Sequence, residues 1–380
     1  MRTRAAVLRE MGRPGPYAES RPLEIAELEL DPPGPGELLV RVHAAGLCHS
    51  DLSVIDGSRP RVMPMALGHE AAGEVVAIGG GGVGSAFAVG DHVALAFVPV
   101  CGSCGPCQDG RAALCEPGAV ANAAGTLLSG ERRWHDPADG DPDAVMHHHL
   151  GVSAFAEHVV VSECSAVRID PTLPYELAAL FGCAVLTGVG AAVYGAQIRP
   201  GDTVAVFGLG GVGLAALLGA VLCGASRIVV VDRVQEKLDL ALELGADVAV
   251  AADEDVVAAV REATGGGPDH VLETVGNADV LGQAYAATRR GGQTVTVGLP
   301  HPDRMLTIPA VSLVAEERTL KGSYLGSCVP ARDIPRFVAL HQAGRLPVEQ
   351  LLTHRLGLDD LNAGFDRLAR GEGVRQVVVL

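Results

Sequence analysis

The sequence has little positive charge relative to negative charge. It contains 29 Lys and Arg residues against 45 Asp and Glu residues, so its formal net charge is −16. Nucleic acids and anionic membranes attract proteins through basic patches, and an acidic chain repels both. The composition therefore argues against nucleic acid or an anionic membrane as a partner.

The sequence also lacks a signal-like start and an unbroken membrane span. Residues Met1 to Glu10 contain no apolar core of signal-peptide length. Leu177 to Ile198 and Thr203 to Ser226 carry no charge and are long enough to cross a bilayer, but several glycines interrupt each. A buried parallel strand followed by its helix has the same hydropathy. We therefore expect a cytoplasmic protein with no membrane partner.

What the chain does contain is length and cysteine. Its 380 residues suffice for two domains with a substantial core. In a cytoplasmic chain, the nine cysteines are better explained as metal ligands than as disulfides.

A glycine-rich turn organises the second half of the chain. The apolar run Thr203 to Phe207 reads as a strand and precedes the turn, and an apolar, helix-compatible run follows it. A second strand-like run ends on Asp232. Such a turn lets the backbone approach a pyrophosphate at a helix N-terminus. The order predicts a dinucleotide site at Gly208, Leu209, Gly210, Gly211, Val212 and Gly213.

Asp232 indicates which dinucleotide binds. It lies 19 residues after Gly213, where a carboxylate can accept hydrogen bonds from the adenosine ribose and repel the additional phosphate of NADP. NAD is therefore favoured. Arg233 could instead contact that phosphate, although a solvated side chain is the preferred interpretation.

Four cysteines lie within one short loop. Cys101, Cys104, Cys107 and Cys115 follow the pattern C-x2-C-x2-C-x7-C among glycines and prolines. Four thiolates can close a tetrahedral structural zinc site that folds the loop around the metal. An iron–sulfur cluster is the alternative for this spacing, and we favour zinc.

Cys48, His69 and Cys183 are candidates for a catalytic metal site. Two thiolates and an imidazole are a donor set that zinc favours, and three protein ligands leave a fourth position for water or substrate. Spacing alone cannot unite residues so far apart. Taken singly, an isolated cysteine is usually a buried packing residue, and a lone histidine is usually a core residue with satisfied hydrogen bonds.

Together these motifs resemble the zinc-dependent medium-chain alcohol dehydrogenases, over nearly the whole chain. The resemblance rests on Gly68-His69-Glu70, the four-cysteine loop, residues 182–192 and the glycine turn. It is closest to the formaldehyde dehydrogenase branch, including the mycothiol-dependent enzymes, through residues 48–51, 150–155 and 344–347.

The resemblance implies an α/β fold in which a Rossmann domain, a doubly wound parallel sheet, is inserted into a β-rich GroES-like catalytic domain. The catalytic domain would span residues 1–184, with the structural zinc lobe near 98–116. The Rossmann domain would span 185–327, and residues 328–380 would return to the catalytic domain.

The resemblance also implies roles for individual residues. Cys48, His69 and Cys183 would bind a catalytic zinc, which Glu70 could approach, so that each chain holds two zinc ions. Ser50 would take the proton of the alcohol and pass it to the nicotinamide ribose. Some relatives end this relay on a histidine, but Ser53 stands at the matching position here, so the proton would reach water directly or through His49.

Further NAD contacts follow only from the resemblance. They lie at His49, Thr187, Val212, Lys237, Val275, Val297, Leu299, Leu325 and Arg375. The implied reaction is a reversible hydride transfer between an alcohol and NAD, which gives an aldehyde or ketone. The segment between Cys115 and Gly151 is long, as in dimeric members, so a homodimer is expected.

The substrate stays open at this point. Glutathione-dependent relatives carry an arginine shortly after the last structural cysteine, whereas Glu116 to Ala119 contains none. Arg59 or Arg61 could serve another carboxylate. A mycothiol adduct, a primary or aromatic alcohol and a secondary-metabolite alcohol remain candidates. The rivals are a zinc-free enone or quinone reductase of the same fold and a non-catalytic NAD-binding redox sensor.

Several other residues have ordinary expectations. Trp134 is either a pocket wall or a hydrophobic anchor, and His147, His148 and His149 are expected to pack and form hydrogen bonds rather than bind metal. Residues 136–142 should form surface turns. Three cysteines should be buried or unreactive, namely Cys164, Cys223 and Cys328.

Overall fold

The computed structural model describes residues 1–138, 140, 144–252 and 255–380 of the chain. It divides into two compact units. The first comprises Met1–Cys183, Val329–Ala339 and Leu352–Leu380, and the second comprises Ala184–Cys328 and Leu340–Leu351. The sequence places residues 340–351 in the C-terminal return, whereas the structure groups them with the second unit. The expected turns at 136–142 lie partly outside the described residues.

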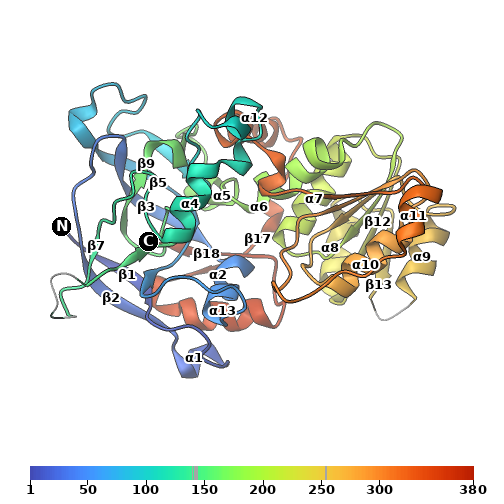
Figure 1. Cartoon of the computed structure of the whole chain (residues 1–380), viewed down its shortest axis with the longest axis horizontal. Helices are drawn as coiled ribbons and strands as arrows, with labels where there is room; N and C mark the ends of the chain where they lie inside the picture. The colour runs from blue at the N-terminus through green and yellow to red at the C-terminus, as the bar shows by residue number, and fades with distance from the viewer. Residues whose placement is uncertain (139, 141–143, 253–254) are drawn as a thin grey trace. The chain divides into compact units, whose positions relative to one another are not determined.

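The first unit is built on two sheets (Figure 1). The smaller sheet has the order β7-β2-β1-β4-β8. Its strands are β1 (Arg2–Leu8), β2 (Leu23–Leu30), β4 (Met65–Ala66), β7 (Trp134–His135) and β8 (His147–His148). Trp134 is 1% exposed within the core of this unit, so it acts as a hydrophobic anchor.

The larger sheet carries the segments that lead into the metal ligands. Its order is β10-β6-β5-β3-β18-β17, and β9 also pairs with β3. Side chains alternate between buried and partly exposed along the middle of β3, as a strand with one face on the core requires. The strands are β3 (Glu37–Gly46), β5 (Glu70–Ile78), β6 (His92–Leu95), β9 (His158–Ser162), β10 (Ala166–Arg168), β17 (Leu352–Leu356) and β18 (Arg375–Val379).

Short helices connect these strands. They are α1 (Tyr17–Ser20), α2 (His49–Ile55), α3 (Gly105–Gln108), α4 (Glu116–Ala124), α5 (Tyr175–Leu180) and α13 (Leu361–Ala369). One further helix, α12 (Pro330–Gln342), begins in the first unit and ends in the second.

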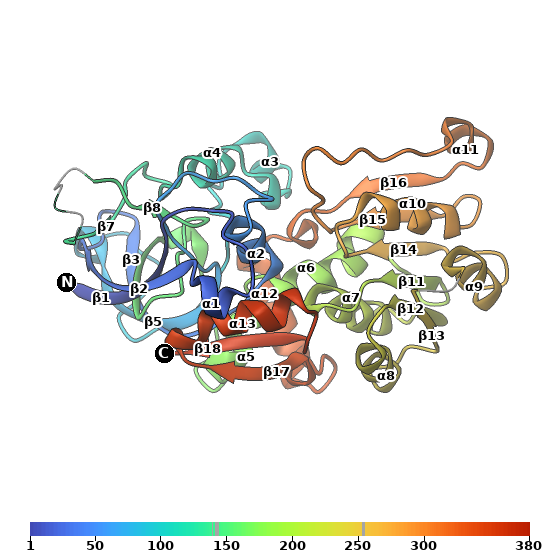
Figure 2. The same cartoon turned by 90° about the horizontal axis from the view of Figure 1, so that it is seen from below.

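The second unit is a parallel sheet with the order β13-β12-β11-β14-β15-β16 (Figure 2). Its strands are β11 (Thr203–Phe207), β12 (Arg227–Asp232), β13 (Val248–Ala251), β14 (His270–Glu273), β15 (Gln293–Thr296) and β16 (Thr319–Gly322). The order runs outward in opposite directions from β11 and β14, which is the doubly wound arrangement. The structure therefore confirms the predicted fold class.

Helices connect the strands of this unit. They are α6 (Ala184–Gly190), α7 (Gly211–Leu222), α8 (Gln235–Glu243), α9 (Val256–Ala263), α10 (Ala278–Ala287) and α11 (Ala310–Ala315). Right-handed crossovers require helices on both faces of such a sheet, and α6 packs against α7 while α9 packs against α10. Within the described part of the chain, no helix is both long and apolar enough to cross a membrane.

Candidate functional site

Cys48, His69, Glu70 and Cys183 meet inside the first unit. Cys48 precedes α2, His69 precedes β5 and Cys183 follows α5, so three separate connections deliver them. All four are buried, and their ligand atoms lie within 4.8 Å of one another. The fold thus unites the residues that spacing alone could not connect.

The chemistry of this set fits a zinc ion. His69 Nε2 and Glu70 Oε1 are buried without a hydrogen-bond partner, which is costly unless another group satisfies them. The hydrogen bond between the thiols holds the pKa of Cys48 well below its usual range and raises that of Cys183 well above it. Two thiols and one available imidazole nitrogen are donors that zinc prefers.

Glu70 is held by a buried ion pair. Its Oε2 lies 2.9 Å from Arg375 Nη2, and Arg375 also donates to the carbonyl of Leu47. Burial raises the pKa of Glu70 to about 7, although the Arg375 charge opposes this. A Cβ at Gly46 would lie 2.6 Å from Glu70 Oε1, so a larger residue there would displace the Glu70 side chain. Arg375 is 4% exposed on its side chain, and its predicted contact with the pyrophosphate stays a prediction.

The Asp51 carboxylate contacts His69, one of the candidate metal ligands. Its Oδ1 is 2.9 Å from His69 Nδ1 and 3.2 Å from His149 Nδ1, and its Oδ2 accepts the N–H of Cys48. Burial raises the pKa of Asp51, but the two imidazoles outweigh burial and lower it. With its Nδ1 proton directed at Asp51, His69 keeps the lone pair of Nε2 for a metal.

The four cysteines of the loop form a second set. Their thiols lie within 4.8 Å of one another, and only Cys115 is buried. Backbone N–H groups point at two of the sulfurs: Cys104 N lies 3.3 Å from Cys101 Sγ, and Gly118 N lies 3.4 Å from Cys115 Sγ. Hydrogen bonds led by those from Ser103 and Cys104 lower the pKa of Cys101 to about 6. The thiolate is therefore favoured at Cys101, whereas burial raises the pKa of Cys107 to about 12 and also raises the pKa of Cys115. Four thiols this close together are the donor set of a structural zinc.

The glycine turn of the second unit has the geometry that its sequence predicts. Gly208 has a φ of 90°, which favours glycine, and a Cβ at Gly213 would lie 1.8 Å from the carbonyl oxygen of Gly208. Gly210 is the N-cap of α7, and a Cβ there would meet no atom within 4 Å. The turn thus leaves open backbone at a helix N-terminus, where a phosphate can approach.

Asp232 ends β12 beside this turn. Its carboxylate accepts the N–H of Leu209 at 2.6 Å and that of Val234 at 2.9 Å. Lys237 is half-buried near Asp232, and burial lowers its pKa despite that carboxylate. Arg233 is exposed. The residues predicted to contact the ribose therefore surround one strand end.

The remaining predicted contacts of the second unit lie near other strand ends. Val275 follows β14 and Leu299 follows β15, and each is about half exposed. A Cβ at Gly298 would lie 2.1 Å from Gly276 N, so the two connections touch. Thr187 on α6 and Val212 on α7 are half-buried, and these two helices pack together. Val297 is half-buried, and Leu325 is buried.

Residues around α2 complete the first unit's predicted set. His49 is exposed and Ser50 is half-buried in the first turn of α2. The Ser53 hydroxyl donates to the carbonyl of His49 at 2.8 Å. Arg59 and Arg61 are both half-buried.

No role was predicted for Asp51, whereas His149 is buried and makes polar contacts, as expected for the three histidines. The position of Asp51, three residues after Cys48 at the start of a helix, is a capping signal that could have identified it. Within 147–149, the three histidines differ: His147 contacts the Pro64 carbonyl, His148 accepts the N–H of Arg133, and His149 contacts Asp51.

The three remaining cysteines differ in burial. Cys164 and Cys223 are half-buried and Cys328 is fully buried. Burial raises the pKa of Cys164 to about 11 and also raises that of Cys223. Raised pKa values disfavour the reactive thiolate, as expected for unreactive thiols.

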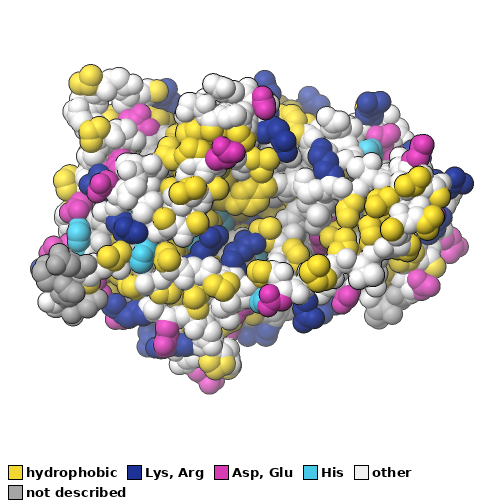
Figure 3. Space-filling view, in the orientation of Figure 1, with side chains coloured by type: hydrophobic (Ala, Val, Ile, Leu, Met, Phe, Trp, Pro, Cys, Tyr) yellow, Lys and Arg dark blue, Asp and Glu magenta, His cyan; other side chains and the backbone are white. Residues whose placement is uncertain are grey.

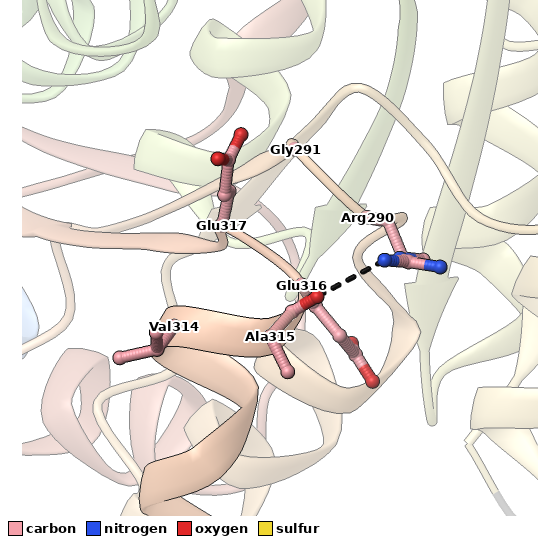
Figure 4. Close-up of a pocket in the computed structure, with 6 residues that line it drawn as sticks. All are labelled: Arg290, Gly291, Val314, Ala315, Glu316 and Glu317. Atoms are coloured by element: carbon pink, nitrogen blue, oxygen red, sulfur yellow. Dashed lines mark hydrogen bonds between the residues drawn. The ribbon is translucent and has the colours of Figure 1, made fainter.

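A hollow of about 440 Å³ opens on the second unit (Figure 4). Arg290 donates to the carbonyl of Ala315 across it at 3.0 Å. Its other lining residues are Gly291, Val314, Glu316 and Glu317. No predicted site residue lines it.

Comparison with known proteins agrees with this description. Residues 34–171 match the alcohol dehydrogenase GroES-like domain, and residues 211–343 match the zinc-binding dehydrogenase family. The geraniol dehydrogenase of Castellaniella defragrans is 39% identical over 377 residues, covering 99% of this chain and 97% of its own. An S-(hydroxymethyl)glutathione dehydrogenase of Escherichia coli is 35% identical over 383 residues, covering 100% of both chains.

A solved structure gives the same result. The benzyl alcohol dehydrogenase of Acinetobacter calcoaceticus superposes with a TM-score of 0.91 at 31% identity, covering 100% of this chain and 99% of that one. These matches confirm the family indicated by the motifs. This chain belongs to the zinc-dependent medium-chain alcohol dehydrogenases and is therefore an oxidoreductase.

Proposed function

We propose that this protein oxidises a primary alcohol to an aldehyde with NAD, and that its preferred alcohols are apolar with an aromatic or unsaturated carbon next to the carbinol. The observation that carries the proposal is the buried set of Cys48, His69 and Cys183, in which His69 Nε2 has no hydrogen-bond partner.

The protein residues would hold the metal and leave one position for the alcohol. A zinc ion bound there would act as a Lewis acid that lowers the pKa of the alcohol hydroxyl. Cys48, His69 and Cys183 would hold it, while the ion pair with Arg375 keeps Glu70 beside the set without making it a fourth permanent ligand. The four cysteines of the loop would hold a second, structural zinc.

Ser50 would relay the proton of the alcohol, accepting it while passing its own hydroxyl proton to the nicotinamide ribose. Its hydroxyl lies in the first turn of α2, two residues after Cys48. Ser53 cannot serve as the base at the end of a relay, because a serine hydroxyl is not basic and this one already donates to His49. Exposed His49 or water would take the proton onward.

NAD is the proposed hydride acceptor. The carboxylate of Asp232 stands at the end of β12, beside the open turn, where it would repel the phosphate that distinguishes NADP. Thr187 and Val212, on two packed helices, would orient the nicotinamide. Positioning of this kind is what the protein contributes to a cofactor's chemistry.

The apolar character of the proposed alcohol is inferred from Phe97, which packs against His69. Phe97 is buried, and its ring lies edge-on to that of His69, with the centroids 5.4 Å apart. The names of the geraniol and benzyl alcohol dehydrogenases above indicate alcohols of the proposed kind. A glutathione adduct is disfavoured because no arginine follows Cys115 in residues 116–119.

The test is NADH formation from NAD over a panel of alcohols. The panel contains benzyl alcohol, geraniol, ethanol and formaldehyde premixed with glutathione or mycothiol. The proposal predicts the highest kcat/KM on benzyl alcohol or geraniol. Turnover only with a thiol adduct would refute the apolar substrate while keeping the enzyme class. No turnover in zinc-loaded protein would refute catalysis on these alcohols altogether.

A homodimer is proposed from the edge of the second unit. Within the described part of the chain, β16 pairs only with β15, so one edge is unpaired. Nearby Met305, Val311 and Val314 are 83%, 71% and 82% exposed, and Figure 3 shows hydrophobic side chains gathered around α11. An unpaired edge with apolar neighbours suits a self-complementary contact. Sedimentation velocity should give twice the mass of the chain, and a monomer at micromolar concentration would contradict this.

A further inference from the structure

The Asp51 carboxylate needs more than one proton donor because it is fully buried. A buried charge is costly unless hydrogen bonds compensate it. Oδ2 accepts the N–H of Cys48, and Oδ1 faces two imidazoles, His69 Nδ1 at 2.9 Å and His149 Nδ1 at 3.2 Å. The contact with His69 is a hydrogen bond, whereas His149 Nδ1 approaches Oδ1 as a close polar contact that lacks hydrogen-bond geometry.

The fold holds His149 firmly in this place. The residue follows β8 and is 1% exposed. Its N–H donates to the Ser153 hydroxyl at 2.8 Å, and its carbonyl accepts the N–H groups of Val152 and Ser153. Its ring stands edge-on to that of His69, with the centroids 5.5 Å apart. His149 therefore contacts both the Asp51 carboxylate and the His69 imidazole, which Asp51 orients.

We propose that His149 is a positioning residue for the zinc ligand His69. The carboxylate that orients His69 is itself oriented by His149, so the two imidazoles share one oxygen of Asp51. Without His149, Oδ1 would retain His69 as its only close imidazole partner, and the His69 ring would be less firmly oriented. The inference rests on the proposed function, because it assumes that His69 binds zinc.

A second metal ion is the alternative use of the same three side chains. Asp51, His69 and His149 present ligand atoms within 4.8 Å of one another. His69 would then have to bind through Nδ1 as well as through Nε2, which requires loss of its ring proton. The Asp51–His69 contact is a hydrogen bond, and the close polar contact with His149 involves the same carboxylate oxygen, so the structure favours the positioning role.

The experiment measures zinc release to a chelator from holoenzyme. His149→Phe retains an aromatic ring but removes the donor, whereas His149→Asn retains an N–H close to the position of Nδ1. His147→Phe is the matched control, because His147 contacts the Pro64 carbonyl and not Asp51. Loss of such an outer partner typically costs about 10- to 100-fold in metal affinity or activity.

The expected result is selective. In His149→Phe, one of two zinc ions should be released roughly 10-fold faster, whereas zinc in the four-cysteine loop should be released at the wild-type rate. His149→Asn and His147→Phe should resemble wild type. In cobalt-substituted protein, the visible bands of the catalytic site should shift in His149→Phe and return in His149→Asn.

Three outcomes would overturn the proposal. The first is an unchanged release rate in His149→Phe. The second is equal acceleration in His149→Phe and His149→Asn, with an equal loss of thermal stability in the metal-free proteins, because packing alone would then explain it. The third is a third metal ion per chain that disappears in His149→Phe. Metal release needs no turnover, so these outcomes are independent of whether any tested alcohol is oxidised.

Discussion

The two cysteine-containing sets of the first unit are assembled in opposite ways. The loop set lies within residues 101–115 and is mostly half-exposed, whereas the buried set joins residues 48, 69, 70 and 183 from three separate connections. A contiguous set can order its own loop around a metal. A dispersed set must be organised by the surrounding fold, which also supplies Arg375, Asp51 and His149. The first arrangement suits a structural metal and the second a reactive one.

The largest expected effect comes from removing one ligand of the loop set. Cys104→Ser should leave the loop without a closed site, and loss of a structural metal is among the few changes that cost more than about 4 kcal/mol. Thermal unfolding with metal analysis measures it. The assignment of the loop set to a structural metal is wrong if Cys104→Ser retains wild-type stability but loses turnover. The loop set would then be the reactive one.

Removing one ligand of the buried set should instead lower the catalytic efficiency. Lewis-acid catalysis is worth several kcal/mol, so Cys183→Ala should lower kcat/KM by roughly 10³-fold. The fold should survive, because the surrounding core of the unit is unchanged. Initial rates of NADH formation and a thermal melt measured on the same sample separate the two effects. A large loss of melting temperature at a retained kcat/KM would reverse the roles of the two sets.

The glycine turn shows that a site whose parts are adjacent in sequence can be predicted from the sequence alone. Its strand, turn, helix and acid are adjacent in sequence, so their geometry could be predicted without the rest of the chain. The loop set is contiguous too. The buried set required a resemblance, because no local pattern connects Cys48 with Cys183. Asp51 and His149 were missed as partners because their contact depends on how β8 and α2 pack, which periodicity does not encode.

A third site, at Asp232, extends the comparison to the second unit. Asp232→Asn keeps one oxygen that can accept the N–H of either Leu209 or Val234, replaces the other acceptor with an NH2 group, and removes the negative charge. It should lower kcat/KM for NAD and raise that for NADP, changing their ratio by roughly 10-fold, as expected for one charged contact. Steady-state kinetics with both cofactors measures the ratio.

Arg233→Ala is the matched neighbour for that experiment. Arg233 is exposed, so this variant should leave the use of NAD unchanged. If Arg233→Ala abolishes a substantial wild-type activity with NADP, then Arg233 rather than Asp232 selects the cofactor. Zinc content should be unaffected in both variants, because no metal ligand of either set lies in the second unit.

The last prediction separates His148 from its neighbour His149. His148 is fully buried, and burial lowers its pKa to about 3, so Nε2 stays neutral and accepts the Arg133 N–H at 3.2 Å. The unfolded chain binds a proton below pH of about 6.5 that the folded chain does not. Stability is therefore complete above this pH and falls by up to about 1.4 kcal/mol per pH unit as the pH drops towards 3.

His148→Gln tests this assignment, because its side-chain oxygen can replace Nε2 as the acceptor but does not titrate. Urea unfolding at neutral pH and near pH 5 should show a weaker acid destabilisation in His148→Gln than in wild type. The zinc-release rate should not change, because His148 does not contact Asp51 in the structure. Parallel pH curves for the two proteins would show that folding does not lower the pKa of His148. A faster zinc release in His148→Gln would show instead that support of the buried set extends beyond His149.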